Sequence, residues 1–299
     1  MRPISKTIVG IKYGEAKTGK TLAAVRAFPD ALFVAPPGAL LCANWLDWTP
    51  NVLDVTGRQG FKFLTETVKK ASGKFPAIVI DDFSLIADME LELCKAQASG
   101  FAAFDLFNQR TYQLIRAARE AQSHVFFTCH VQAPREVKKD NNNRYIPGAP
   151  LIPGWQMPAK FPAMVDFCAR VIHDTSSPGW PYKYATGPDE HYVQGDRLAV
   201  LPERFPLNLR EAMLGAGIDV PRPEALAWMD EHVEGISKLL SAASEAKRPD
   251  YKKVMAHAAS SFLADHSPRH ARWVLADAMD RMVLRQHTDN LIADFIGNY

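Results

Sequence analysis

Eight residues near the N-terminus have the types and the spacing of a phosphate-binding loop. They fit the pattern G-x-x-x-x-G-K-[ST] and are Gly14, Glu15, Ala16, Lys17, Thr18, Gly19, Lys20 and Thr21. In such a loop the backbone N–H groups point at the phosphates, and the following helix adds the positive end of its dipole. Lys20 is expected to reach the β- and γ-phosphates, and the Thr21 hydroxyl to hold Mg²⁺. The sequence therefore predicts a bound nucleoside triphosphate, expected to be ATP.

Two carboxylates follow a short apolar run further along the chain. The residues Ala77-Ile-Val-Ile lead directly into Asp81 and Asp82, which is the Walker B pattern. Asp81 is expected to orient the water shell of the Mg²⁺ ion. Asp82 has two open interpretations: it accepts a proton from the attacking water, or it caps a helix that starts at Phe83 or Ser84.

A third polar position lies at the end of the apolar run 124–130. This run is expected to form the strand beside residues 77–80, which would place His130 close to the γ-phosphate. His130 is therefore the candidate sensor of that phosphate. The alternative is a histidine with a purely structural role.

The elements that must position these residues alternate between strand and helix. Strands are predicted at residues 7–13, 31–35, 77–80 and 124–130, a helix follows Thr21, and residues 85–122 are helical with a break near Ser99-Gly100. The strands are continuously apolar, which is typical of strands buried on both faces. We expect an α/β fold with a mainly parallel sheet flanked by helices.

The second half of the chain is less regular. Residues 132–158 read as a long mobile loop or an irregular hairpin, and strands are predicted at 167–173, 181–185 and 197–200, possibly antiparallel. After the prolines at 221 and 223, three or four short helices are expected, with breaks near 247–250 and 267–268. The predicted organisation is a core at residues 1–220 and a helical C-terminal appendage at 221–299, where a protein partner would dock.

Composition narrows the class of protein. The chain has 299 residues, of which 47% are hydrophobic and 23% charged, and no apolar run approaches the roughly 20 residues of a membrane span. The four cysteines are far apart with no C-x-x-C pair, which argues against a disulfide scaffold and a zinc site. The N-terminus does not read as a signal peptide, so the expected location is the cytoplasm. A net charge of +2 is so small that any basic surface must be local.

Together these segments resemble a known family. Gly14 to Thr21, Ile78 to Asp82 and Thr128 to His130, followed by Pro153-Gly-Trp and residues 161–170, resemble the phage-encoded P-loop nucleotide-binding proteins related to RecA, among them single-strand-annealing recombination ATPases. The resemblance covers about residues 6–205. It implies a RecA-like P-loop NTPase core, Mg²⁺-dependent ATP hydrolysis, a homo-oligomer, action on single-stranded DNA in recombination or replication, and the host cytoplasm as the location of a phage-encoded protein.

Two departures from the family pattern concern catalysis. A family Lys-x-Arg element contacts the nucleotide of the neighbouring subunit, and the matching place here is Gly195-Asp196-Arg197. The resemblance thus implies a trans contact by Arg197, without the lysine; the alternative is that Arg197 is a plain surface residue. Relatives often carry a water-activating glutamate after the second strand, where this chain has Pro36-Pro37-Gly38. The general base is therefore left open, and slow hydrolysis is expected.

In RecA relatives the loop after the sensor strand meets DNA. In this chain that loop contains Arg135, Lys138, Lys139, Arg144 and Tyr145. The cations would follow phosphates and the tyrosine would stack on a base. Alternatives remain open: a solvated loop that binds nothing, a nucleotide-dependent switch or assembly protein without DNA contact, and a DNA-packaging or remodelling motor.

Overall fold

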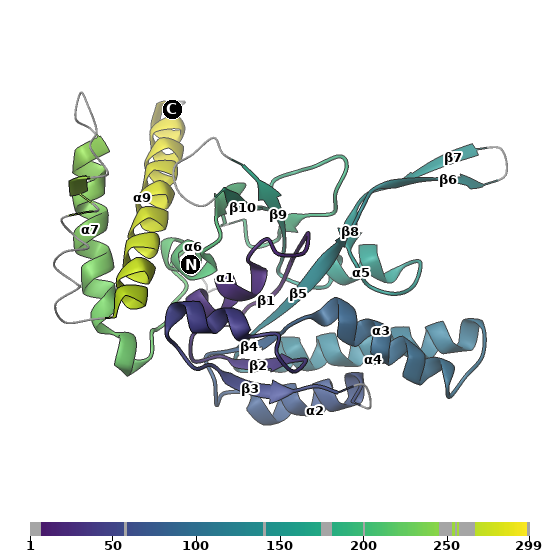
Figure 1. The fold of residues 1–299 in the computed structure, drawn as a ribbon. Coiled ribbons are helices and arrows are strands. Elements are labelled where there is room, and N and C mark those ends of the chain that lie inside the picture. Colours follow the sequence, from purple (N-terminus) through teal and green to yellow (C-terminus); the bar gives the residue numbers. More distant parts are fainter. Residues whose placement is uncertain are drawn as a thin grey trace.

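The protein is a three-layer α/β structure (Figure 1). The computed structural model describes residues 7–56, 59–139, 142–174, 181–199, 201–244, 253–254, 256 and 267–297, but not the side chains of residues 139, 142–144 and 286–297. A central sheet separates two groups of helices, and a hairpin projects from one end of the molecule. The expected α/β class with a mostly parallel sheet is confirmed.

Ten strands of the described chain form the sheet, and its centre is parallel. The parallel strands lie in the order β9-β1-β5-β4-β2-β3 and are β1 (Val9–Gly14), β2 (Leu32–Ala35), β3 (Asn51–Asp54), β4 (Ala77–Ile80), β5 (His124–Gln132) and β9 (Phe167–His173). Strand β5 therefore lies between β1 and β4, so the predicted neighbours 124–130 and 77–80 do pair. Because parallel strands share their direction, the carboxyl ends of β1, β4 and β5 meet at one edge.

Antiparallel strands extend the sheet beyond β9. These are β10 (Tyr182–Ala185), β12 (Arg204–Pro206) and β11 (Gly195–Asp196), while β8 (Ala149–Pro150) pairs with the end of β5. Of the strands predicted here as possibly antiparallel, residues 181–185 do run antiparallel to their neighbours, whereas 167–173 form β9, which is parallel to β1. The strand expected at 197–200 is wrong, because Arg197 and Leu198 lie in a turn after β11. Residue 200 lies outside the described residues.

Helices cover both faces of the sheet. One face carries α1 (Lys20–Ala27), α6 (Leu209–Gly215), α7 (Trp228–Ser244) and α9 (Pro268–Gly297), together with the 3₁₀ helices η1 (Leu41–Leu46) and η2 (Glu224–Leu226). The other face carries α2 (Phe61–Ala71), α3 (Phe83–Lys95), α4 (Phe101–Glu120) and α5 (Met157–Ala163). Every residue of β1 and of β4 is buried, which explains why β4 is apolar on both sides and why β1 is apolar apart from Lys12.

The C-terminal helices pack on the core. Trp273 and Val274 of α9 are fully buried in the same hydrophobic cluster as Phe28 and Phe126, which belong to the sheet and the α1 side. The expectation of short helices is wrong, since α7 has 17 residues and α9 has 30. The predicted break at 267–268 coincides with the start of α9, and the break at 247–250 lies outside the described residues. Within the described ranges, no helix combines the length and the apolar character that a membrane span requires.

The segment after β5 is more regular than the sequence suggested. Instead of a mobile loop or irregular hairpin, it contains an antiparallel hairpin of β6 (Arg135–Lys139) and β7 (Asn142–Ile146), in register from Arg135↔Ile146 to Lys139↔Asn142. Strand β5 leads into it almost without interruption, and the hairpin extends away from the body of the protein (Figure 1).

Candidate functional site

The loop between β1 and α1 has a backbone that its glycines make possible. Gly14 ends β1 against β9, where a Cβ atom would lie 2.8 Å from Cβ of Val171. Gly19, which precedes α1, has φ 89°, a value that side chains disfavour. The first N–H groups of α1 lack partners within the helix, and Gly19 forms no side-chain cap. The loop thus turns sharply, and the unpaired N–H groups at the start of α1 face the space beyond the carboxyl end of β1.

Lys20 lies folded over this loop. Its Nζ donates hydrogen bonds to the carbonyl oxygens of Gly14, at 3.0 Å, and of Glu15, at 2.6 Å. The side chain is largely buried, and burial lowers the pKa of Lys20, with Asp82 and Asp81 acting in the opposite direction. A cation therefore lies at the mouth of the loop, close to two carboxylates.

Thr21 and Asp81 form the link between the loop and β4. The Thr21 Oγ1 donates to Oδ2 of Asp81 at 2.7 Å, and Thr128 of β5 donates its hydroxyl to the other carboxylate oxygen. Asp81 is only 3% exposed. Its carboxylate is therefore a buried group at the carboxyl end of β4, and the two hydroxyls fix its position. Two predicted metal ligands, sixty positions apart, therefore lie in direct contact.

His130 and Asp82 form a second pair next to the loop. The His130 Nε2 lies 2.7 Å from Oδ2 of Asp82, and the sheet register places His130 directly beside Gly14. The Asp82 Oδ1 accepts a hydrogen bond from the Ser84 backbone at 2.9 Å, so Asp82 caps α3 as one of its two interpretations predicted. Burial raises the pKa of Asp82, and His130 opposes that shift.

The oxygen atoms of Thr21 and Asp81 are the candidate metal ligands of this site. No group of three or more His, Cys, Asp or Glu side chains suitable for a metal occurs among the residues that the structure describes. Zinc and calcium sites usually need such a group, whereas Mg²⁺ commonly takes one or two protein oxygens and fills its other positions with phosphates and water. The hydroxyl of Thr21 and the carboxylate of Asp81 fit Mg²⁺ in this way.

Arg197 lies apart from this group of residues. Its backbone N–H bonds the carbonyl of Asp166, which precedes β9, and its side chain donates to the carbonyl of Ala163 at 3.1 Å. Strand β9 begins level with Gly10, so Arg197 is at the opposite edge of the sheet from the loop after Gly14. Within one chain it does not reach the site, and its contact with a neighbouring subunit stays a prediction.

The predicted DNA-contacting residues lie on the hairpin, away from the loop. Arg135 and Lys138 are exposed on β6, three positions apart, so they project to opposite faces of the ribbon. Tyr145 is 44% exposed, and its hydroxyl lies 2.8 Å from Nδ1 of His191. The side chains of Lys139 and Arg144 lie outside the described residues.

Sequence reasoning missed two polar residues of this site. Thr128 holds Asp81, and the Ser84 hydroxyl accepts a hydrogen bond from the backbone N–H of His130 at 2.9 Å. The signal for Thr128 was its spacing from His130, because residues two apart on a strand share a face. Its contact with Asp81 also depends on the register that pairs Ile80 with Phe127.

Comparison with known proteins adds nothing to this geometry: no model of a protein family matches the sequence, and no curated protein matches it significantly.

Proposed function

We propose that this protein is a Mg²⁺-dependent P-loop ATPase with a RecA-like core. The observation that carries the proposal is the hydrogen bond between Thr21 and Asp81. Each residue belongs to a separate sequence pattern, one for phosphates and one for the metal, and an NTPase needs both at the same edge of the sheet. The resemblance to RecA-related phage proteins supports the same reading.

The residues around the loop then have distinct tasks. The backbone of residues 14–19 surrounds the phosphates, and the ammonium group of Lys20 moves from the carbonyls of Gly14 and Glu15 to phosphate oxygens. Thr21 and Asp81 hold Mg²⁺, which when bound neutralises charge on the β- and γ-phosphates. Because charge builds up on those oxygens as the bond breaks, a fixed cation there lowers the barrier.

Asp82 and His130 are assigned to the γ-phosphate end of the site. The capping bond fixes Oδ1 of Asp82, which leaves Oδ2 to orient the imidazole of His130. The imidazole, beside Gly14, contacts the γ-phosphate or its attacking water. The proton of the attacking water then passes to the free Nδ1 of His130 while the Nε2 proton passes to Oδ2 of Asp82, whose raised carboxyl pKa makes it a better acceptor than an ordinary aspartate.

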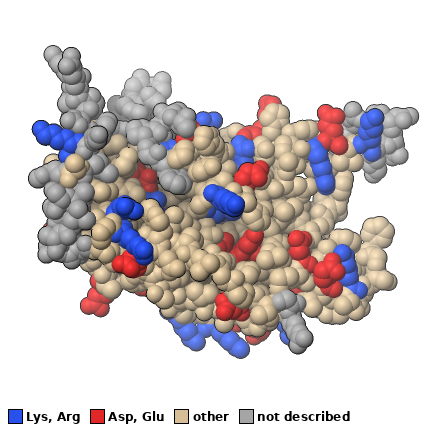
Figure 2. Space-filling view, viewed as in Figure 1, with Lys and Arg blue, Asp and Glu red and all other residues tan. Residues whose placement is uncertain are grey.

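A second part of the proposal is action on single-stranded DNA, and the hairpin supports it. Strand β5 carries His130 and continues two residues later into the arm that bears Arg135 and Lys138. The candidate γ-phosphate sensor and the arm are therefore connected by one strand and a two-residue link. Figure 2 shows that Lys, Arg, Asp and Glu are interspersed over the face in view, without one continuous basic band, so the arm is the local cationic element in the expected place.

Titration of ATP into the parent protein and into Lys20→Ala, with Mg²⁺ present, tests the proposal. The variant should lose most of its affinity or its turnover and keep its thermal unfolding temperature, because the lysine supplies charge at the phosphates. Lys69→Ala on α2 removes an exposed lysine and should bind as the parent does. Unchanged ATP binding in Lys20→Ala would reject the P-loop assignment. Turnover measured with and without single-stranded DNA, at two salt concentrations, tests the second part.

A further inference from the structure

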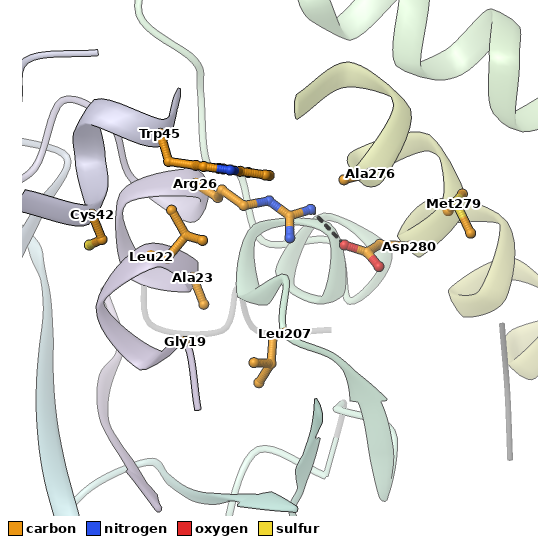
Figure 3. Close-up of a pocket in the computed structure, with 10 residues that line it drawn as sticks. All are labelled: Gly19, Leu22, Ala23, Arg26, Cys42, Trp45, Leu207, Ala276, Met279 and Asp280. Carbon is orange, nitrogen blue, oxygen red and sulfur yellow. Dashed lines mark hydrogen bonds and ion pairs between the residues drawn. The ribbon is translucent and has the colours of Figure 1, made fainter. Parts of the chain in front are cut away.

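A cavity of about 640 Å³ begins at the phosphate loop and runs along the outer side of α1 (Figure 3). Its α1 wall consists of Gly19, Leu22, Ala23 and Arg26. These positions recur every three or four residues and so form one face of the helix. From Gly19 to Arg26 the helix rises about 10 Å, which is on the order of the distance between the phosphates and the base of a nucleotide.

The wall opposite the sheet comes from η1. Cys42 and Trp45 line the cavity there, and the indole of Trp45 lies alongside Arg26 with its face toward the interior (Figure 3). Trp45 is 46% exposed, so a large part of its indole is open to the cavity and to solvent. A flat aromatic surface of this kind is suited to stacking on a heterocyclic base.

The third wall comes from the C-terminal helix. Ala276, Met279 and Asp280 of α9 face the cavity, and Asp280 accepts a hydrogen bond from Nη2 of Arg26 at 2.7 Å. Helix α9, which closes the cavity, is about 250 positions along the chain from the loop where the cavity begins. It lies outside residues 6–205, the part that resembles RecA relatives.

One polar atom beside the cavity is left without a partner. The Nε of Arg26 is buried and forms no hydrogen bond with any residue that the structure describes. The side chain is 11% exposed, and its Nη2 is fixed by Asp277 and Asp280. Because this Nε has almost no accessible surface, the polar group that the wall offers to a ligand is the partly exposed pair of Arg26 and Asp280, whose oxygens and N–H groups suit a sugar hydroxyl or a ring nitrogen of a nucleoside.

We propose that this cavity holds the base and ribose of the bound nucleotide, with Trp45 as the stacking surface and α9 as the closing wall. This inference rests on the proposed nucleotide binding. It adds two points: the position of the nucleoside, and the contribution of the C-terminal helix to its site. The volume lies within the usual range for small-molecule sites, and the mainly apolar walls with a few polar groups are typical of them. The C-terminal helix therefore contributes directly to nucleotide affinity.

The test compares ATP with inorganic tripolyphosphate, which has the phosphates and no nucleoside. Binding of both is measured by calorimetry with Mg²⁺ for the parent, Trp45→Ala and Ala276→Phe, the latter filling the cavity from α9. Both variants should weaken ATP binding by roughly tenfold or more, the contribution of one base stack, and leave tripolyphosphate binding unchanged. Leu41→Ala is the matched control, because Leu41 is 71% exposed on the same 3₁₀ helix and does not line the cavity.

The outcomes separate this inference from the function on which it rests. A parent protein that binds neither ligand would overturn the P-loop assignment. A parent that binds both, with variants that keep the parental ratio of ATP to tripolyphosphate affinity, would overturn the nucleoside site alone. Tripolyphosphate binding also shows whether each variant is folded. If Ala276→Phe disturbs the packing of α9, Trp45→Ala still tests the nucleoside site, because Trp45 is half-exposed and its removal should not affect folding.

Discussion

Arg26, in the last turn of the helix after the loop Gly14–Thr21, donates a hydrogen bond to Asp277 of the C-terminal helix at 2.7 Å. The same carboxylate accepts a hydrogen bond from Asn208 at 2.9 Å and is paired with Arg222, which is fully buried. Asp277 itself is 1% exposed. A buried carboxylate shared by two arginines therefore joins α1 to the helices that follow residue 220.

The first prediction is that Asp277→Ala destabilises the whole protein. The change removes the anion that two buried guanidinium groups share, although Arg26 keeps Asp280 and Arg222 keeps Asp230, so the expected loss of unfolding free energy is about 3 kcal/mol, at the lower end for a broken buried pair. Denaturant unfolding followed by circular dichroism measures this. Glu92→Ala, which removes one partner of the exposed Lys95–Glu92 pair, should change the free energy by less than about 1 kcal/mol. Similar small effects for both variants would show that the Asp277 cluster does not hold α9 to the core.

Lys12 carries the second prediction, because it is a fully buried lysine in β1 whose Nζ has no hydrogen-bond partner among the described residues. Burial lowers its pKa from 10.5 to about 8, and Asp81 opposes the shift. Below pH 8 the folded state must carry a buried charge, so Lys12 destabilises the fold there. Between about pH 8 and 10.5 the unfolded chain binds a proton that the folded one does not, and stability rises with pH.

Lys12→Met keeps the length of the side chain and removes the charge. At pH 7 the variant should be more stable than the parent by roughly 3 kcal/mol, and its advantage should shrink as the pH approaches 10.5. Unfolding free energies of both proteins at pH 7, 8, 9 and 10 measure the difference. A constant difference across this range would mean that Lys12 keeps its ordinary pKa in the fold.

The centre of the fold could be predicted from sequence, and its edges could not. Strand β4 is a continuous apolar run, and β1 and β5 are largely apolar before they end at glycine or at polar residues; such runs occur in buried parallel strands. Strand β3 was missed because three of its four residues are exposed, so it has no apolar pattern. The hairpin β6–β7 was predicted as irregular because its charged and asparagine-rich sequence resembles a loop.

In the candidate site, too, the local pattern could be predicted from sequence and the long-range contacts could not. The loop from Gly14 to Thr21 could be proposed as a phosphate site from sequence because the pattern that suggests it consists of residues adjacent in the chain. The contact of Thr128 with Asp81 depends on sheet register, and the approach of Asp280 to Arg26 depends on the packing of α9 on α1. Neither contact can be predicted from the residues that are adjacent in the sequence.

Asp81→Asn gives the third prediction, which concerns the metal. The amide keeps the size of the side chain and removes its charge, so Mg²⁺ affinity should fall by roughly 10- to 100-fold, and turnover with it. Nucleotide docking should suffer less, because backbone amides of the loop still hold the phosphates. Titrating turnover with Mg²⁺ measures the change, and Asp88→Asn, at an exposed position of α3, is the control. A parental Mg²⁺ dependence in Asp81→Asn would move the metal site elsewhere.

Arg197 supplies the fourth prediction, because its distance from its own loop leaves only a neighbouring subunit to contact. Arg197→Ala should bind ATP normally and hydrolyse it roughly 1000-fold more slowly. Mixing it with Lys20→Ala should restore part of the activity, because some interfaces then combine an intact loop with an intact arginine. Arg204→Ala, at an exposed arginine of β12, should hydrolyse ATP at the parental rate. Absence of rescue, together with a monomeric mass in light scattering, would leave Arg197 as a surface residue.

The last prediction concerns the hairpin as a contact for single-stranded DNA. Changing Arg135, Lys138, Lys139 and Arg144 together to Ala should leave folding and basal ATP turnover intact, because Arg135 and Lys138 are exposed and the arm extends away from the core. Binding to a single-stranded oligonucleotide should weaken. Each lost phosphate contact should also reduce the slope of log affinity against log salt by roughly 0.7.

A matched variant separates this effect from the loss of net charge. Changing Lys69, Lys70, Lys95 and Arg116 to Ala removes the same number of cations from the exposed surfaces of α2, α3 and α4. Fluorescence anisotropy at several salt concentrations should then show a flattened slope for the hairpin variant alone, since long-range attraction is screened within about 10 Å at 0.1 M salt. Equal slopes in the two variants would mean that DNA responds to overall charge and not to the arm. A parent protein that binds no DNA at any salt concentration would favour a nucleotide-dependent switch or assembly protein, with the arm and α9 as surfaces for a protein partner.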